Sequence, residues 1–101
     1  MTRPDYREQL LIDADHPALA GHFPGNPVVP GVVLLDACQE ACARMLGCPV
    51  RVVGLPRVKF LRALRPGERA ELVLTGEPPR IGLRIVCSGQ TVASGELELA
   101  R

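Results

Sequence analysis

The stretch that most limits what this chain can fold into runs from Gly21 to Asp36 and reads GHFPGNPVVPGVVLLD. Three glycines and three prolines stand among its first eleven residues. Proline fixes φ and glycine adopts backbone angles closed to other residues, so such a segment is built for one irregular loop. The loop leads directly into an apolar run. With His22 in the loop and a carboxyl on the run that follows, the stretch indicates an active site.

The apolar run from Val32 to Leu46 predicts the one long helix of the chain. Pro30 suits the first helical position, where a missing N–H costs nothing. Gly47 followed by Pro49 is a common helix ending. Only four side chains in the run are polar: Asp36, Gln39, Glu40 and Arg44. A helix with so few polar side chains must be buried around most of its circumference.

Five segments have the composition of strands, one before the predicted helix and four after it. The sequence places them at 6–13, 50–60, 69–76, 81–87 and 91–99, with turns between them. Gly54 and Pro56 interrupt the second segment and predict a bulge or bend there. Apolar residues at alternate positions of the fourth segment predict a half-buried strand, and Ser88–Gly89 predicts a hairpin turn.

These elements predict an α+β domain over residues 1–101, in which an antiparallel sheet wraps one long central helix. A single sheet covers one side of that helix. The other side would leave an apolar face larger than a soluble monomer usually shows. Association about a twofold axis would bury this face, so we expect a homodimer, with a heterodimer as the alternative.

Composition excludes several classes of function. The formal net charge of +1 does not force a basic face for nucleic acid. No apolar run reaches the ~18 residues that span a membrane, and no signal peptide is evident. The four cysteines form no CxxC pair and stand near no histidine doublet. We therefore expect buried free thiols in a reducing cytoplasm, rather than disulfides or a structural metal.

The motif GHFPGNPVVPGVVLLDA leads into the predicted helix, around which the predicted sheet wraps. In both features the chain resembles the β-hydroxyacyl-acyl-carrier-protein dehydratases, which have the hotdog fold. The resemblance is densest over 16–40 and continues through GLPRVKF, RPGE and the final hairpin. It implies that His22 is the catalytic base and Asp36 the acid. It also implies that the backbone N–H of Gly31 binds the thioester carbonyl, with Phe23 and Pro30 as further substrate-binding residues. No metal or organic cofactor is implied.

The chemistry of dehydration fits these residue types. Removing water from a 3-hydroxyacyl thioester needs a base for the α-proton and an acid for the departing hydroxyl. Histidine titrates near neutrality and suits the base. The apolar residues 33–35 beside Asp36 would favour the protonated carboxyl that an acid needs. An N–H in the first turn of a helix, reinforced by the helix dipole, would stabilise charge on the thioester oxygen.

Three features depart from the family pattern. Asp36 is typical of the dehydratase-isomerase branch, whereas the larger dehydratase branch carries glutamate. Glu40 stands where both branches usually have glutamine, and we interpret Glu40 and Arg44 as a solvated pair. We also expect no long leader before the first strand, a feature in which the sequence resembles the short dehydratases of aryl-polyene and polyketide-like pathways. These departures concern the substrate more than the reaction.

Two other functions stay open at the level of sequence. A hotdog thioesterase would hydrolyse an acyl thioester, with the carboxylate activating water and His22 in a secondary role. A non-catalytic hotdog subunit would only bind an acyl carrier or complete a heterodimer. The presence of both His22 and Asp36 counts against the non-catalytic subunit.

The resemblance also implies an acidic partner, an acyl carrier protein with its substrate on a phosphopantetheine arm. Because the overall charge is near zero, docking needs a local basic patch. We expect that patch at Arg57, Lys59, Arg62 and Arg65. Alternation along an extended run would then turn Val58 and Phe60 toward the core. A solvated strand edge is the alternative interpretation of these charges.

Overall fold

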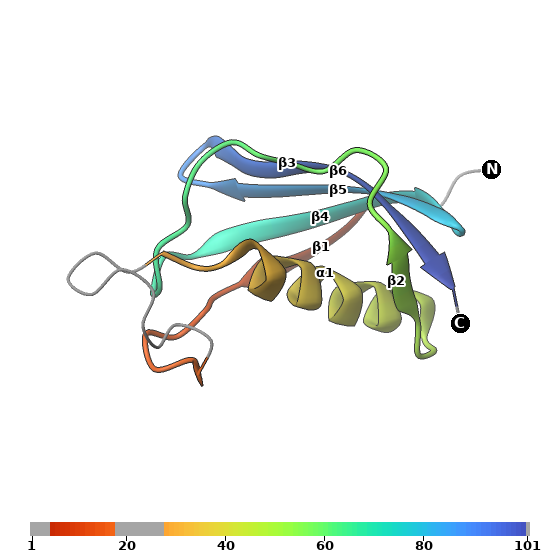
Figure 1. Ribbon diagram of the computed structural model, residues 1–101, viewed down its shortest axis with the longest axis horizontal. Helices are drawn as coiled ribbons and strands as arrows, with labels where there is room; N and C mark the ends of the chain where they lie inside the picture. The colour runs from red at the N-terminus through yellow and green to blue at the C-terminus, as the bar shows by residue number, and fades with distance from the viewer. Residues whose placement is uncertain (1–4, 18–27, 101) are drawn as a thin grey trace.

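The computed structural model describes residues 5–17 and 28–100. Within them the chain forms one helix and a six-stranded antiparallel sheet. The elements are β1 (Tyr6–Leu10), α1 (Gly31–Leu46), β2 (Arg51–Gly54), β3 (Lys59–Phe60), β4 (Ala70–Glu77), β5 (Arg80–Cys87) and β6 (Gln90–Ala100). The strand order is β1-β4-β5-β6-β2, and β3 also pairs with β6. Figure 1 shows α1 lying along one face of this sheet.

The core lies between α1 and the sheet. The helix contributes small and medium apolar side chains to it: Val33, Leu34, Cys38, Ala41 and Cys42. The sheet contributes larger ones, among them Leu72, Leu74, Ile81, Ile85 and Leu97, each with less than 2% of its surface exposed. Small side chains on the helix let it approach the sheet closely, while branched side chains on the strands fill the space between them. The predicted sheet-wrapped helix is therefore confirmed.

The helix begins and ends close to the predicted residues. Its first residue is Gly31, and Pro30 precedes it in an extended conformation, with φ −61° and ψ 146°. The prediction that Pro30 occupies the first helical position is therefore wrong by one residue. At the other end, Gly47 adopts a left-handed conformation, with φ 73°, and its N–H donates to the carbonyl of Ala43. This is the ending that glycine permits without a steric cost.

The strands differ from the expected ones in two respects. The first strand ends at Leu10, three residues before the predicted end. The predicted strand 50–60 is divided into β2 and β3, which both pair with the long β6, so five strands follow the helix rather than four. The register of β2 on β6 shifts between Val52 and Gly54, as the glycine and Pro56 predict. The hairpin at Ser88–Gly89 is confirmed, with φ 51° and 75° at its two residues.

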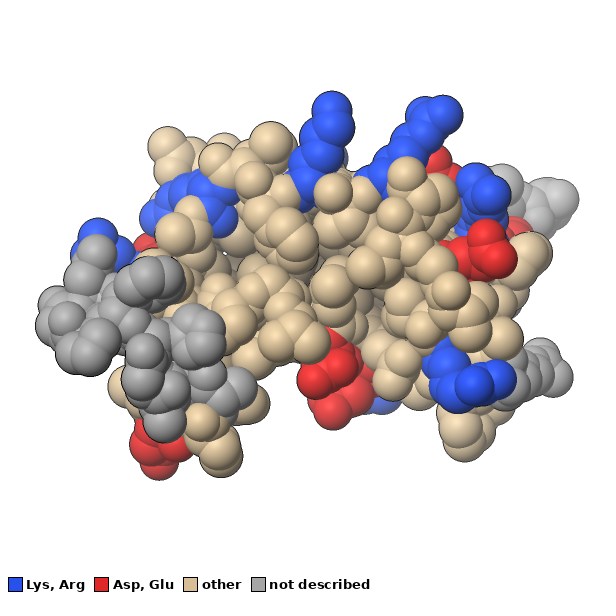
Figure 2. Space-filling model, viewed as in Figure 1, with Lys and Arg blue, Asp and Glu red and all other residues tan. Residues whose placement is uncertain are grey.

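Apolar side chains also remain exposed on the described part of the chain. Six large ones are more than two-fifths exposed: Leu11, Val32, Val53, Leu55, Phe60 and Leu61. Figure 2 shows uncharged side chains across most of the face that carries α1, with lysine and arginine along its upper margin. Such a surface is typical of a protein that buries it against a partner. The helix of the described residues is too short to cross a membrane.

Candidate active site

A groove of about 500 Å³ lies at the N-terminal end of α1. One wall consists of Val29, Gly31 and Leu34, which belong to the approach to the helix and its first turn. The other wall is the continuous segment 60–64, the last residue of β3 and the four residues after it. A hydrogen bond joins the two walls, because the N–H of Val29 donates to the carbonyl of Leu64 at 2.7 Å. The groove therefore forms where the expected loop enters the helix.

The first turn of α1 offers backbone donors at this groove. The carbonyl of Pro30 accepts the N–H of Val33 at 3.0 Å and that of Leu34 at 3.4 Å. The N–H groups of Gly31 and Val32 are left without an acceptor inside the helix, as at every helix N-terminus. Together with the helix dipole, these donors favour an oxygen that carries negative charge. Gly31 is the first helical residue, and its role in binding the thioester stays a prediction.

The ring of Phe60 lies directly against Gly31. A Cβ atom added to the glycine would stand 2.9 Å from Cζ of Phe60 and 3.3 Å from both Cε atoms. The ring is 49% exposed and lines the groove, so the prediction that Phe60 faces a closed core is wrong. The ring therefore covers the start of α1, and about half of the Phe60 surface stays exposed.

Asp36 lies on the exposed face of α1, five residues after Gly31. The side chains of Val33 and Leu34 turn into the core, with 6% and 2% of their surface exposed, and so point away from its carboxyl. The expectation that these neighbours give Asp36 an apolar environment is therefore not met within one chain. Side chains four residues apart on a helix share a face, which places Asp36 beside Val32 and Glu40.

Arg44 has a different partner from the predicted one. Its guanidinium donates to both carboxylate oxygens of Glu8 on β1, and Glu8 also accepts the hydroxyl of Tyr6 at 2.7 Å. The predicted ion pair between Arg44 and Glu40 is therefore wrong, because Arg44 instead makes a bidentate contact with Glu8 on the neighbouring strand. The Arg44 contact lowers the pKa of Glu8 most, although partial burial works against it.

His22 and Phe23 lie outside the described residues. Their predicted roles, and the separation between His22 and Asp36, therefore stay predictions. The nearest described residues on either side are Pro17 and Val28, and Val28 directly precedes the wall that carries Val29 and Gly31.

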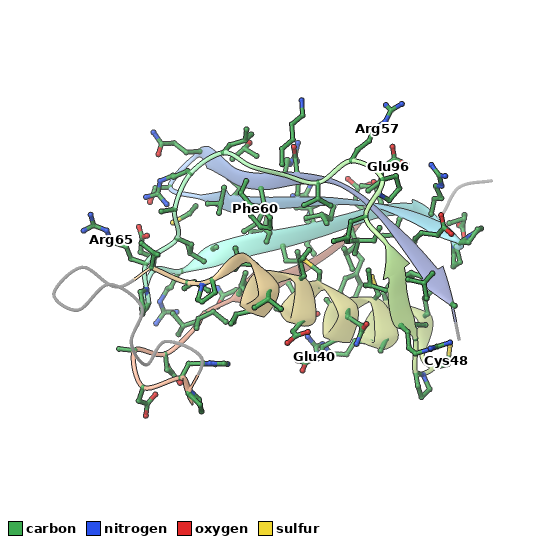
Figure 3. All side chains as sticks on the ribbon, in the orientation of Figure 1. Glu40, Cys48, Arg57, Phe60, Arg65 and Glu96 are labelled. Atoms are coloured by element: carbon green, nitrogen blue, oxygen red, sulfur yellow. The ribbon has the colours of Figure 1, made fainter. Side chains whose placement is uncertain are left out.

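The four basic residues predicted as a docking patch do not form one cluster. Figure 3 places Arg57 and Arg65 at opposite ends of the molecule, with Arg57 close to Glu96. Arg57, Lys59 and Arg65 are exposed. The guanidinium of Arg62 is engaged instead by nearby acceptors, the carboxylate of Glu68 at 3.0 Å and the carbonyl of Ala63 at 3.2 Å. Sequence spacing missed this because the segment after β3 bends back rather than staying extended.

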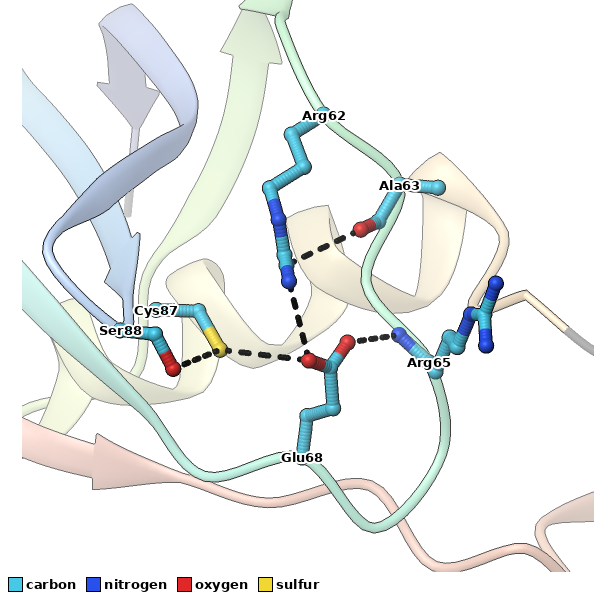
Figure 4. A network of polar contacts seen from close by, with 6 residues as sticks. All are labelled: Arg62, Ala63, Arg65, Glu68, Cys87 and Ser88. Carbon is cyan, nitrogen blue, oxygen red and sulfur yellow. Dashed lines mark hydrogen bonds and ion pairs between the residues drawn. The ribbon is translucent and has the colours of Figure 1, made fainter.

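Glu68 is a residue that the sequence did not single out for the site. Figure 4 shows its carboxylate between Arg62, the backbone of Arg65 and the thiol of Cys87. The hydrogen bond from Arg62 is the main cause that lowers the pKa of Glu68, followed by the N–H of Arg65. The available signal was the turn Arg65-Pro66-Gly67, since an acidic side chain after such a turn readily accepts a backbone N–H within it.

The cysteines are free, and Cys38, Cys42 and Cys87 are buried as expected, while Cys48 is half-buried. Burial raises the pKa of Cys38 to about 12 and that of Cys42 to about 11. These thiols are therefore protonated at neutral pH and behave as small apolar side chains. Among the residues that the structure describes, no group of three or more histidine, cysteine, aspartate or glutamate side chains is arranged to hold a metal ion.

Comparison with known proteins assigns the fold and the family. The ApeI-like dehydratase family model matches residues 2–96. Two curated relatives named 3-hydroxyacyl-[acyl-carrier-protein] dehydratase FabZ are similar. That of Chloroflexus aggregans is 33% identical over 91% of this chain and 72% of its own length. That of Thermomicrobium roseum is 36% identical over 88% of this chain and 68% of its own length.

Solved structures of other proteins have the same fold as this chain. The dehydratase heterocomplex ApeI:P from Xenorhabdus doucetiae superposes with a TM-score of 0.84 and 26% identity, covering 96% of this chain and 88% of that one. The (R)-hydratase of A. caviae, at 16% identity and a TM-score of 0.72, shows the shared fold. A long helix wrapped by one antiparallel sheet is the hotdog fold that these structures share, and the curated relatives are dehydratases. The chain belongs to the ApeI-like dehydratases, within the β-hydroxyacyl-acyl-carrier-protein dehydratase family.

Proposed function

We propose that this chain dehydrates a 3-hydroxyacyl thioester, carried on an acyl carrier protein, to the trans-2-enoyl thioester. The observation that carries the proposal is the groove at the start of α1, where the donors of the first turn meet a wall of apolar side chains. A thioester carbonyl placed in it would accept from the N–H of Gly31. Asp36, on the same helix, lies a little more than one turn further along.

The reaction divides between two side chains. Neutral His22 removes the α-proton, and the negative charge that develops on the thioester oxygen is stabilised by the N–H of Gly31. Asp36, in its protonated form, gives its proton to the 3-hydroxyl group, which leaves as water while the double bond forms. The carboxylate of Asp36 and the imidazolium of His22 then exchange a proton, directly or through water, and both return to their starting forms. The sequence of steps needs no metal and no organic cofactor.

We further propose that the site is completed by a second chain. Asp36 is exposed, so an environment that favours its protonated form has to come from another surface. The apolar side chains of Val32, Phe60 and Leu61 lie exposed beside the groove and suit such a surface. Our proposal is a homodimer, with His22 of one chain facing Asp36 of the other. A related chain as partner is the alternative, since the ApeI relative is a heterocomplex.

For the carrier protein, the proposed docking residues are now Arg57, between β2 and β3, and Lys59, the first residue of β3; both are exposed. An acidic carrier would be attracted to them mainly through its association rate. Reversing both to glutamate is expected to raise the KM for a carrier-bound substrate several-fold and to leave turnover of a small pantetheine-like thioester unchanged. Equal losses on both substrates would show that the two residues act on the fold instead. Free thiols are consistent with a cytoplasmic enzyme.

The reaction is tested with a 3-hydroxyacyl N-acetylcysteamine thioester. Dehydration gives an enoyl thioester, followed by its ultraviolet absorbance, whereas hydrolysis gives a free thiol, followed with a thiol reagent. We expect the enoyl signal without release of thiol. Release of thiol at the same rate as substrate loss would replace the proposal with a thioesterase, and no loss of any carrier-bound 3-hydroxyacyl substrate would favour a non-catalytic subunit.

A further inference from the structure

Glu68 gathers three donors from two segments, two of them from the residues after β3 and one from the end of β5. Its Oε2 accepts from Nη2 of Arg62 at 3.0 Å and lies 3.7 Å from Sγ of Cys87 at the end of β5. Its Oε1 accepts the backbone N–H of Arg65 at 2.8 Å. Hydrogen bonds that involve a charged group are stronger than neutral ones and fix geometry as well. One carboxylate thus connects the segment after β3 to the hairpin between β5 and β6 (Figure 4).

The segment connected in this way is one wall of the groove. Residues 61–65 belong to no strand, so no ladder of hydrogen bonds sets their shape. At one end of the wall, the N–H groups of Leu61 and Arg62 donate to the carbonyl of Val92, at 2.8 and 3.3 Å. At the other end, the carbonyl of Leu64 accepts from Val29. Arg62 lies at the first of these points and Arg65 directly follows the second, and both donate to the carboxylate of Glu68.

The same wall reaches the proposed site through the backbone. The bond between Val29 and Leu64 is 2.7 Å long and lies two residues before Gly31, the first residue of α1. Because this bond joins the two walls, a displacement of Leu64 shifts the start of α1 relative to the rest of the segment 60–64. When Glu68 holds this wall, the groove keeps one width. Without the contacts of Glu68, the groove width could change while the acid and the base stay the same.

We propose that Glu68 is a positioning residue of the active site, which holds the segment 61–65 and through it fixes the wall 60–64 and the width of the groove that takes the acyl thioester. This inference rests on the proposed function, because it assumes that a thioester occupies the groove. The carboxylate itself touches no substrate. Loss of its contacts is expected to weaken substrate binding much more than the chemical step.

The test compares Glu68→Ala with a matched control. Glu71→Ala removes the carboxylate of another arginine–glutamate pair, whose Oε1 lies 2.9 Å from Nη1 of Arg7 and which does not line the groove. With a 3-hydroxyacyl N-acetylcysteamine thioester, we expect Glu68→Ala to raise KM about tenfold and to change kcat by less than about threefold. Glu71→Ala should change neither. Glu68→Gln keeps an acceptor for one donor and is expected to recover part of the loss.

Two measurements separate a failure of this inference from a failure of the proposed function. Amide hydrogen exchange of 61–65 is expected to speed up in Glu68→Ala and not in Glu71→Ala, whatever the enzyme's substrate. Calorimetric titration of the same thioester in an Asp36→Asn background is expected to show about tenfold weaker binding when Glu68 is also replaced. Unchanged exchange, unchanged binding, or equal KM changes in the two alanine variants would each overturn the positioning role.

Discussion

Replacing Gly31 with alanine tests whether the start of α1 binds the thioester. The new methyl carbon would stand 2.9 Å from Cζ of Phe60, so the ring must retreat by about 0.5 Å to reach an ordinary contact of 3.4 Å. The residue is half exposed and a small change in χ1 moves Cζ, so the fold should accept this shift. Alanine is the better helix former by up to about 1 kcal/mol. We therefore expect stability to stay within about 1 kcal/mol of wild type.

The effect on activity should be much larger than the effect on stability. The methyl group would occupy the space through which a thioester oxygen approaches the N–H of Gly31. Losing one such donor typically costs about 10²-fold or more in rate. We expect kcat/KM for a 3-hydroxyacyl thioester to fall about 10²-fold in Gly31→Ala, with an unfolding transition close to that of wild type. Wild-type kcat/KM in this folded variant would refute the role of the helix start.

The displaced ring offers a competing explanation, which a second substitution separates. Phe60→Leu shortens the side chain that the methyl would contact. If the methyl acts only by pushing the ring, the double variant Gly31→Ala/Phe60→Leu should recover activity to the level of Phe60→Leu alone. If the methyl blocks the donor, the double variant should stay as slow as Gly31→Ala. The second result is expected.

Two further predictions concern the fold. Removing the Glu8 carboxylate in Glu8→Gln should lower the free energy of unfolding by up to about 1 kcal/mol at neutral pH. The folded-state pKa of Glu8 lies below its usual value of 4.5. The difference in unfolding free energy between wild type and Glu8→Gln should therefore be present above pH 4.5 and disappear as the pH falls through the folded-state pKa. Chemical denaturation at several pH values measures it. A difference that persists at pH 2 would contradict the assigned contact. A thiol reagent at pH 8 should label the half-buried Cys48 first. Cys38 has a pKa of about 12 and a fully buried side chain, so it should react only on unfolding. Rapid labelling of Cys38 in the native protein, detected by peptide mass, would contradict its burial.

The features that local sequence determines were predictable. Gly47 marks the end of α1, since left-handed φ favours glycine, and Ser88–Gly89 closes the hairpin for a similar reason. The alternation in β5 identified its buried side because a strand paired on both edges keeps its side chains on fixed faces. Each of these signals lies within a few residues, so a single sequence contains it.

The features that depend on distant segments were not predictable in the same way. Arg44 contacts Glu8, which lies 36 residues away in the sequence, rather than its neighbour Glu40 on the helix. Phe60 faces the helix side of the sheet, but at its open end, where alternation does not tell a covered position from an uncovered one. Arg62 pairs with Glu68 across the turn Arg65-Pro66-Gly67, and the turn motif alone does not say which basic side chain the carboxylate of Glu68 contacts.

The central claim is that two copies of this chain share a site made of His22 and Asp36. The most direct test is the rate of enoyl formation by His22→Ala, by Asp36→Asn, and by the two mixed under conditions that let chains exchange. Each variant alone should be at least ~100-fold slower than wild type, because a positioned acid or base contributes that much. In the mixture, half of the dimers should be mixed and should hold one intact site, so activity should return to about a quarter of wild type. A mixture no faster than the average of the two variants, or near-wild-type turnover by either folded variant alone, would contradict the account.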